Sequence, residues 1–392
     1  MQITQVIKND IINIDEEDLS KLIEIFTFKK KGKYFTSGRT CYYKLSCPII
    51  IDNTVYSYVK IKGSGALNGK RQFIKPSNHP FVRKDPHFGI DNDGRPTMIY
   101  SEPSPYGGIT LSRANQEYNN FRYLYNSNVS TLLPLFVYKY DNLYFNNESL
   151  GISVSLCEDN LPLRMDKLLY TNELMPKEYY EFYKKVYFSE FGENTNLNFD
   201  DKAKLIKKIA YKYAREIRKF ADAGMYIHSG GWSNIQYSFS KKNVVLIDLD
   251  SSRKIKDPRL SLLLNCRDLI SNIYRLFINL YNPKCIEEYN EKVIYDKDYV
   301  LSLISGFFYS VDNRKLINIS KLINKFYIDN CFNKIKLIEN IMLCIPEDEV
   351  TRYELDIYKF YDYCMYLLYP IFFKFEKKKI DKYITYNSYE RR

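Results

Sequence analysis

The spacing of apolar side chains divides the chain into a first part of strands mixed with helices and a second part made mainly of helices. Residues 54–62 (TVYSYVKIK) place apolar side chains at alternate positions, which predicts a strand. Residues 201–223 repeat apolar side chains at helical spacing and are followed by Gly224, which predicts a helix and its end. We predict further helices over 16–28, 113–125, 177–191, 267–280, 300–309, 315–328, 334–344 and 352–375, and further strands over 41–51 and 152–156. This order of elements indicates an α+β fold.

The stretch 224–253 carries the first candidate chemistry of the chain. A polar loop from His228 to Asn234 leads into a predicted hairpin, whose second strand is the short apolar run 244–247. Asp248 stands at the end of that strand. A hairpin brings Asn234 and Asp248 side by side as two hard oxygen ligands, which suits Mg²⁺ bound together with substrate phosphates. We therefore predict that Asn234 and Asp248 hold Mg²⁺ or Mn²⁺.

The order of His228, Asn234 and Asp248 resembles that of protein kinases. In that family a catalytic loop begins with His and ends with Asn, and the strand that follows ends in a metal-binding Asp. The resemblance implies a two-lobed kinase-like fold that binds ATP, with His228 in the catalytic loop, packed beneath Asp248. Two residues after His228, where kinases carry the catalytic Asp, this chain has Gly230. The metal-binding half of the kinase motif is therefore present, and the carboxylate that acts as base is not.

Asp250 is the candidate for that missing base. Kinases follow their metal-binding Asp with Phe-Gly, whereas Asp248 is followed by Leu249 and Asp250. On an extended backbone Asp248 and Asp250 face the same side, so Asp250 could be a second metal ligand or replace the base. Two structural roles are equally open, an ion pair with Arg253 or the capping of a turn.

The predicted strand 54–62 carries the candidate phosphate contacts. Lys60 and Lys62 lie on one face of it, because side chains alternate along a strand with a period of two. Spacing alone favours two solvated lysines on the polar face of an edge strand. In the kinase fold, however, a Lys of this strand holds the α- and β-phosphates of ATP, and a Glu of the next helix orients it. The resemblance assigns these roles to Lys60 or Lys62 and to Glu117.

A long stretch, 63–112, follows this strand and is rich in glycine and basic residues. Glycine amides and basic side chains together fit a phosphate cradle. The order of three motifs is similar to that of the selenoprotein O family of kinase-fold AMPylators: Lys62-Gly63-Ser64-Gly65, Asp93-Gly94-Arg95 and Glu117. This resemblance implies ATP contacts at Gly63 and Gly65 and the transfer of AMP. That family carries an Asp as base just before its metal-binding Asn, and here that residue is Ser233.

Two lobes follow from these assignments. Residues 1–157 form a small α+β lobe with the insert 63–112, and residues 158–392 form a helical lobe that contains the hairpin 224–253. Glu158 begins the turn that corresponds to the kinase linker between the lobes, whose backbone groups hold adenine.

The helix 267–280 begins with a further acidic residue, Asp268. In kinase folds a buried Asp at the start of this helix hydrogen-bonds the backbone of the catalytic loop, and we assign that role to Asp268. Only 20 residues separate Asp248 from Asp268, which leaves no room for the long activation segment of eukaryotic protein kinases. The chain therefore resembles atypical or small-molecule kinases.

Composition narrows the function classes. The formal net charge is +11, but Lys and Arg are spread along the chain, so a solvated surface is favoured and a nucleic-acid partner is not expected. The 8 cysteines form no CxxC pair, which excludes the spacing of a zinc site and indicates free thiols in the cytoplasm. The apolar run 363–373 contains Pro370 and is too short to span a bilayer.

The sequence thus predicts an ATP-dependent transferase with Mg²⁺ or Mn²⁺ as cofactor. It would move a phosphoryl or an adenylyl group to a protein, peptide or small-molecule acceptor. The alternative is a pseudokinase, a nucleotide-binding scaffold that regulates a partner, because Gly230 and Ser233 both lack the carboxylate of a base.

Overall fold

The structure is a computed structural model that describes residues 1–33, 39–67, 72–81, 87–90, 96–99, 103–158, 163–227, 231–281, 297–332 and 347–372. The chain forms two compact units, each of which is described by itself below. The first unit contains Met1–Asp85, Tyr100–Met165 and Ser233–Arg253. The second contains Pro86–Ile99, Asp166–Trp232 and Lys254–Arg392. The predicted α+β class is confirmed.

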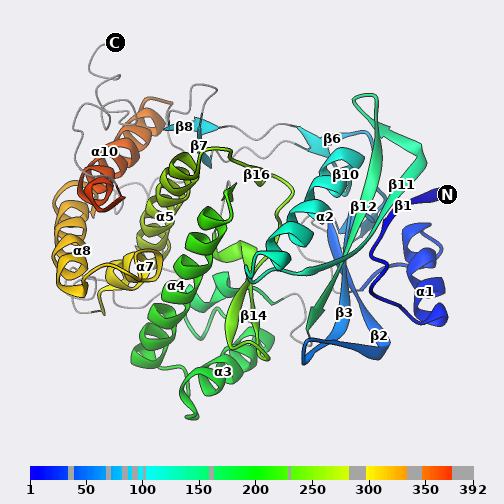
Figure 1. Ribbon diagram of the computed structural model, residues 1–392, viewed down its shortest axis with the longest axis horizontal. Helices are drawn as coiled ribbons and strands as arrows, with labels where there is room; N and C mark the ends of the chain where they lie inside the picture. The colour runs from blue at the N-terminus through cyan, green and yellow to red at the C-terminus, as the bar shows by residue number, and fades with distance from the viewer. Residues whose placement is uncertain are drawn as a thin grey trace. The chain divides into compact units, whose positions relative to one another are not determined.

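The first unit is built on an antiparallel sheet (Figure 1). The strand order is β1-β11-β12-β3-β2, and the short strand β10 pairs with β12. Their bounds are β1 Ile3–Lys8, β2 Thr40–Ile51, β3 Thr54–Lys62, β10 Ile109–Thr110, β11 Leu133–Phe145 and β12 Glu148–Glu158. The predicted strand 54–62 is β3. It lies inside the sheet between β12 and β2, so its lysines do not belong to an edge strand.

The two faces of β3 have different neighbours. Val59 and Ile61 belong to the apolar core that the sheet shares with helix α1 (Glu16–Phe26). Lys60 and Lys62 point to the opposite face, because side chains alternate along a strand. Helix α2 (Leu111–Asn126) packs against β11 and β12 and contributes its own buried contacts to the sheet. The lysines are therefore directed away from the main apolar core of this unit.

The sequence between β3 and α2 contains three pairs of short strands, of which the last belongs to the second unit. They are β4 (Ala66–Leu67) with β5 (Phe73–Ile74), β6 (Pro80–Phe81) with β9 (Ser104–Pro105), and β7 (His87–Ile90) with β8 (Pro96–Ile99). The predicted irregular stretch 63–112 therefore contains paired strands, which its glycines and prolines concealed. The motif Asp93-Gly94-Arg95 lies outside the described residues.

A hairpin of β14 (Ile235–Ser238) and β15 (Asn243–Leu246) follows the short helix η2 (Trp232–Asn234). It groups with the sheet in the first unit, whereas the sequence placed it with the helical lobe. The reason is a non-local contact, since the Leu246 amide donates to the Ser130 carbonyl at 2.8 Å. The lobe boundary between residues 157 and 158 stays a prediction.

The second unit is mainly helical. Its helices are α3 (Lys177–Phe191), α4 (Phe199–Asp222), α5 (Pro258–Tyr281), α7 (Tyr299–Phe307), α8 (Asn313–Tyr327) and α10 (Glu347–Phe372), with short turns at η1 (Met165–Leu169) and η3 (Ile328–Phe332) and short strands at β13 (Met225–Tyr226) and β16 (Arg253–Lys254). Helix α4 packs against α5 and α7 (Figure 1). Gly306 permits the close approach of α7, because a Cβ there would lie 2.2 Å from the Tyr211 carbonyl oxygen.

One helix starts earlier than its apolar spacing indicated. We predicted 267–280, and α5 begins at Pro258. Asp257 caps this end by accepting a hydrogen bond from the Arg259 amide at 2.9 Å, and proline is favoured at the first helical position. Asp268 consequently lies in the middle of a helix. The predicted helix 334–344 lies outside the described residues, and none of the helices described combines the length and apolarity needed to cross a membrane.

Candidate functional site

A buried group of charged side chains lies at the end of β3. Lys62 Nζ forms ion pairs with Glu117 Oε1 at 3.2 Å and with Asp248 Oδ1. The side chains of Lys62 and Glu117 are only 2% and 1% exposed. Strand β3, helix α2 and the hairpin thus each supply one member, and all three belong to the first unit. The structure brings together three residues that the sequence separated by as many as 186 positions.

Lys60 contacts the same glutamate and no aspartate. Its Nζ lies 3.6 Å from Glu117 Oε1, and its side chain is buried. Lys62 Nζ also lies 3.3 Å from Asp250 Oδ1. The sequence left open which of the two lysines faces the cleft, and the ion pairs with Asp248 and Asp250 indicate Lys62.

Arg39 completes the group and was missed by the sequence analysis. Its Nη2 lies 2.8 Å from Asp250 Oδ2, although 211 residues separate the two. Asp250 therefore pairs with Arg39 and Lys62, and the predicted alternative of Arg253 is not its ion-pair partner among the described residues. We call the set Arg39, Lys60, Lys62, Glu117, Asp248 and Asp250 the charge cluster.

The hairpin fixes the position of Asp248. The Ile247 amide donates to the Asn234 carbonyl at 3.0 Å, which places Asn234 beside the residue that precedes Asp248. The backbone of Asp248 is left-handed, with φ of 64°. Residues other than glycine rarely adopt this region, and such conformations gather at functional sites. Its side chain is 32% exposed, which makes it the most accessible carboxylate of the charge cluster.

Helix α2 is tied to the segment that follows Asp248. Asn120 Nδ2 donates to the carbonyls of Leu249 and Ser252, each at 2.8 Å, and Gln116 Nε2 donates to the same Ser252 carbonyl at 2.7 Å. Glu117 stands between these two amides on the helix. These hydrogen bonds therefore fix the helix that carries Glu117 against the segment that carries Asp250.

Electrostatics keeps Lys62 and the aspartates charged. Burial by itself would raise the pKa of Asp248, but the cations of Lys62, Lys60 and Arg39 outweigh it and hold that pKa well below its ordinary value. Burial likewise opposes ionisation of Asp250, and Lys62 and Arg39 still lower its pKa. Burial disfavours charge on Lys62, yet the aspartates raise its pKa. For Lys60 burial dominates and lowers the pKa.

The donor set fits a magnesium-like ion. Asp248 offers a partly exposed carboxylate, and Asn234, half-buried beside it, offers an amide oxygen. Mg²⁺ commonly takes one or two carboxylates and completes its shell with water and phosphate. No cluster of three or more His, Cys, Asp or Glu side chains suited to a metal occurs among the residues described, so a closed protein-only cage is not formed there. Asn234 and Asp248 stay the predicted metal ligands.

Gly63 and Gly65 form a tight corner after β3. Both have positive φ, 100° and 107°, and a Cβ on Gly63 would lie 2.5 Å from the Gly151 carbonyl oxygen. The Gly63 amide donates to the Arg39 carbonyl at 2.8 Å and the Gly65 amide to the Gly107 carbonyl at 3.0 Å. Because these amides already have backbone partners, the structure gives both glycines a conformational role, and contact with ATP stays a prediction.

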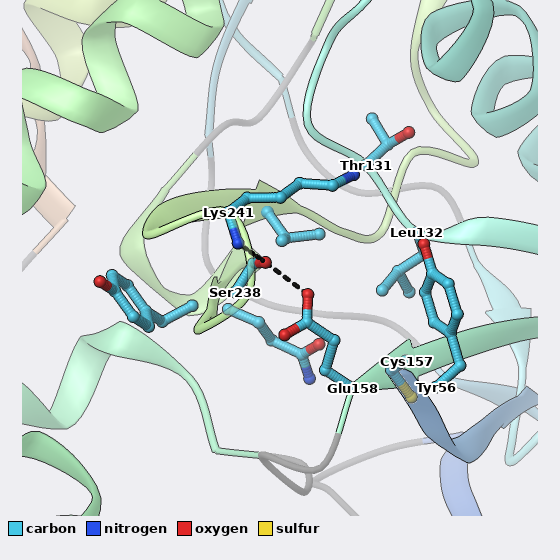
Figure 2. Close-up of a pocket in the computed structure, with 10 residues that line it drawn as sticks. Tyr56, Thr131, Leu132, Cys157, Glu158, Ser238 and Lys241 are labelled. Carbon is cyan, nitrogen blue, oxygen red and sulfur yellow. Dashed lines mark hydrogen bonds between the residues drawn. The ribbon is translucent and has the colours of Figure 1, made fainter. Parts of the chain in front are cut away.

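Glu158 holds the hairpin turn. Its carboxylate accepts hydrogen bonds from the hydroxyls of Ser238 and Ser240 and from the Phe239 amide at 3.1 Å. Figure 2 shows Glu158 among the residues that line a pocket, which also include Tyr56, Thr131 and Lys241. The lining shares no residue with the charge cluster. The Glu158 carboxylate therefore stabilises the hairpin turn, and adenine binding by this linker stays a prediction.

The predicted catalytic loop is only partly described. His228 and Gly230 lie outside the described residues, so the role of His228 stays a prediction. The residue just before them is held by helix α5, where Asn265 accepts from the Ile227 amide at 3.2 Å and donates to the Met225 carbonyl at 2.7 Å. Residues 228–230 of the loop lie outside the described residues, so the contact that we assigned to Asp268 stays a prediction.

Asp268 contacts two described side chains. It accepts from the Tyr226 hydroxyl at 3.2 Å and pairs with Arg267 at 3.0 Å. The contacts of Asn265 with the backbone before the loop were not predicted, because an amide at this position carries no signal that distinguishes it in the sequence.

Comparison with known proteins adds little. No protein-family model matches the chain, and no curated protein matches it. Among the solved structures found, one described as "WaaP in complex with acyl carrier protein" is 11% identical, with a TM-score of 0.35, and the match covers 83% of this chain and 98% of that chain.

Proposed function

We propose that the chain is an ATP-dependent transferase of the protein-kinase-like class. The observation that supports this most directly is the contact of Lys62 with both Glu117 and Asp248. Kinases use the same three side-chain types, where a strand Lys held by a helix Glu pairs with the phosphates and an Asp at a hairpin end holds the metal ion. The order of the three along this chain is also the kinase order.

Each residue of the cluster has a distinct part in this proposal. Lys62 offers a fixed positive charge to the phosphates of ATP, because Glu117 and the strand hold its ammonium in place. Asp248 and Asn234 hold Mg²⁺ or Mn²⁺, which neutralises phosphate charge when bound. Positioning and charge stabilisation account for most of the catalysis of phosphoryl transfer. A site without a carboxylate base can therefore still transfer a group, more slowly.

The transferred group and its acceptor remain to be found by experiment. The order of Lys62-Gly63-Ser64-Gly65 and Glu117 favours adenylyl transfer, as in the selenoprotein O family. The charge cluster itself suits transfer from the α-phosphate and from the γ-phosphate of ATP equally. Proteins, peptides and small molecules are all candidate acceptors.

The test uses two ATP samples, one labelled on the γ-phosphate and one on the α-phosphate. Each is incubated with the protein, Mg²⁺ or Mn²⁺, and a lysate of its own host. Transfer of the γ label alone identifies a kinase, and transfer of the α label alone identifies an AMPylator. Asp248→Asn should abolish the signal, and the matched variant Asp141→Asn should keep it, because Asp141 pairs only with the exposed Thr4 hydroxyl in its side-chain contacts. Transfer that survives Asp248→Asn would contradict the proposal.

A second candidate function is a nucleotide-binding pseudokinase. It is favoured by the state of Asp250, whose two carboxylate oxygens are both taken by cations, Arg39 and Lys62. The residue that could have replaced the base is thus not directed at an acceptor. If neither label moves while ATP raises the melting temperature of the protein, this candidate replaces the transferase.

A further inference from the structure

Arg39 and Asp250 form an ion pair with a fixed geometry on both sides. Arg39 directly precedes β2, and its carbonyl accepts from the Gly63 amide at 2.8 Å, so its backbone is attached to the end of the strand that carries Lys62. Its guanidinium then reaches Asp250 at 2.8 Å. The Asp250 side chain is only 6% exposed. Arg39 therefore connects the lysine strand to the segment after the hairpin.

The two aspartates of the charge cluster are in different states. Asp250 has one cation on each oxygen, Arg39 on Oδ2 and Lys62 on Oδ1. Among the described residues, Asp248 has a single ion-pair partner, Lys62, and is far more exposed. A metal ion that approaches Asp250 would have to displace the half-buried Arg39 from a buried carboxylate, whereas one that approaches Asp248 meets a partly exposed carboxylate. Breaking a buried ion pair by removing one partner is strongly unfavourable.

The charges of the cluster are also balanced without a ligand. Its three carboxylates, Glu117, Asp248 and Asp250, face three cations, Arg39, Lys60 and Lys62. A second divalent ion at Asp250 would add positive charge beside Arg39 and Lys62, in a region from which water is largely excluded. Like charges in such a place repel strongly, because screening by solvent is weak.

We propose that Arg39 withdraws Asp250 from the set of metal ligands, so that one divalent cation binds, at Asp248, while Asp250 orients Lys62. This proposal depends on the function proposed above, in that it concerns the metal ion of the same site. Arg39 and Asp250 are positioning residues, since they act through Lys62.

The test counts Mn²⁺ ions bound per chain by equilibrium dialysis, with a non-hydrolysable ATP analogue present at saturation. The wild type should bind one Mn²⁺ ion. Asp248→Asn should weaken Mn²⁺ binding by about tenfold or more, because a ligand is lost. The double variant R39Q/D250N removes both charges of the pair together, so it keeps the cluster balanced and should still bind one ion. Arg39→Gln alone should bind a second ion, because it frees the Oδ2 atom of Asp250.

Two results would overturn the inference. If R39Q/D250N lost Mn²⁺ as Asp248→Asn does, or if the wild type bound a second ion that R39Q/D250N lacked, Asp250 would be a ligand, and the proposed transferase would be unaffected. If the wild type bound neither Mn²⁺ nor the ATP analogue, the inference and the proposed function would both fail. The melting temperature of each variant confirms that a loss of binding is not a loss of folding.

Discussion

Lys60 and Lys62 share the Oε1 atom of Glu117, at 3.6 and 3.2 Å, yet only Lys62 reaches the aspartates. The two lysines are two residues apart on one face of β3 and are both buried, so the main difference between them is which carboxylates they contact. This pair offers a comparison within the molecule, because the same substitution at the two positions removes the same charge from the same face.

We expect Lys62→Met to reduce transfer of the label by a factor of about 100 or more, because a charge that stabilises the transition state is lost. Lys60→Met should reduce it much less. Its own ion pair is the longer one, and burial already lowers the pKa of Lys60. Initial rates at saturating ATP measure the ratio. Equal losses in the two variants would mean that Lys62 has no special role.

Asp250→Asn should destabilise the fold by about 3–5 kcal/mol, because it removes a buried carboxylate that pairs with both the half-buried Arg39 and the buried Lys62. The double variant R39Q/D250N should recover a large part of this loss. Chemical denaturation of the two single variants and the double variant gives the coupling. If the losses of the single variants simply add, the two side chains do not interact.

Asn120→Ala should cost about 1–3 kcal/mol of stability, because two buried hydrogen bonds to Leu249 and Ser252 are lost. It should also lower activity, since α2 carries Glu117. The matched control is Asn119→Ala, one residue earlier on the same helix and exposed to solvent. Unfolding curves and transfer rates are measured for both, and an equal effect at Asn119 would exclude a role for the contacts of Asn120.

Acid should release the ion pairs of the cluster. The pKa values of Asp248 and Asp250 are both lowered in the folded protein. Their contribution to the free energy of unfolding is therefore complete above the ordinary pKa of Asp, about 4, and is lost as the pH falls towards the folded values. We expect the wild type to lose more stability than R39Q/D250N between about pH 4 and pH 3. Parallel curves in this range would argue against a lowered pKa at Asp250.

The local elements could be predicted from the sequence because their signals are local. Strand β3 and helix α3 have the bounds that spacing predicted, and a period of two correctly placed Lys60 and Lys62 on one face. The hairpin that brings Asn234 next to the residue before Asp248 was also predicted, because its turn and its apolar strand are contiguous in the chain.

The partners of these residues could not be predicted, because they come from remote segments. Nothing within reach of Asp250 in the sequence points to Arg39, 211 residues away. The hairpin contacts the first unit through the hydrogen bond from the Leu246 amide to the Ser130 carbonyl. No motif in the sequence around Ser130 indicates this contact. Glu158 was predicted to lie in the linker between the lobes. Its carboxylate instead accepts hydrogen bonds from a turn some 80 residues later in the chain, which lies next to Glu158 only in the tertiary fold.

The left-handed backbone at Asp248 limits which residues that position can accept. Asparagine, aspartate and glycine tolerate this conformation, whereas residues branched at Cβ do not. In a saturation library at position 248, only a few variants should fold. Among those that fold, aspartate alone should be active. Asparagine and glycine are each one nucleotide change away from aspartate. A random mutation at this codon can therefore abolish the proposed activity while the protein still folds.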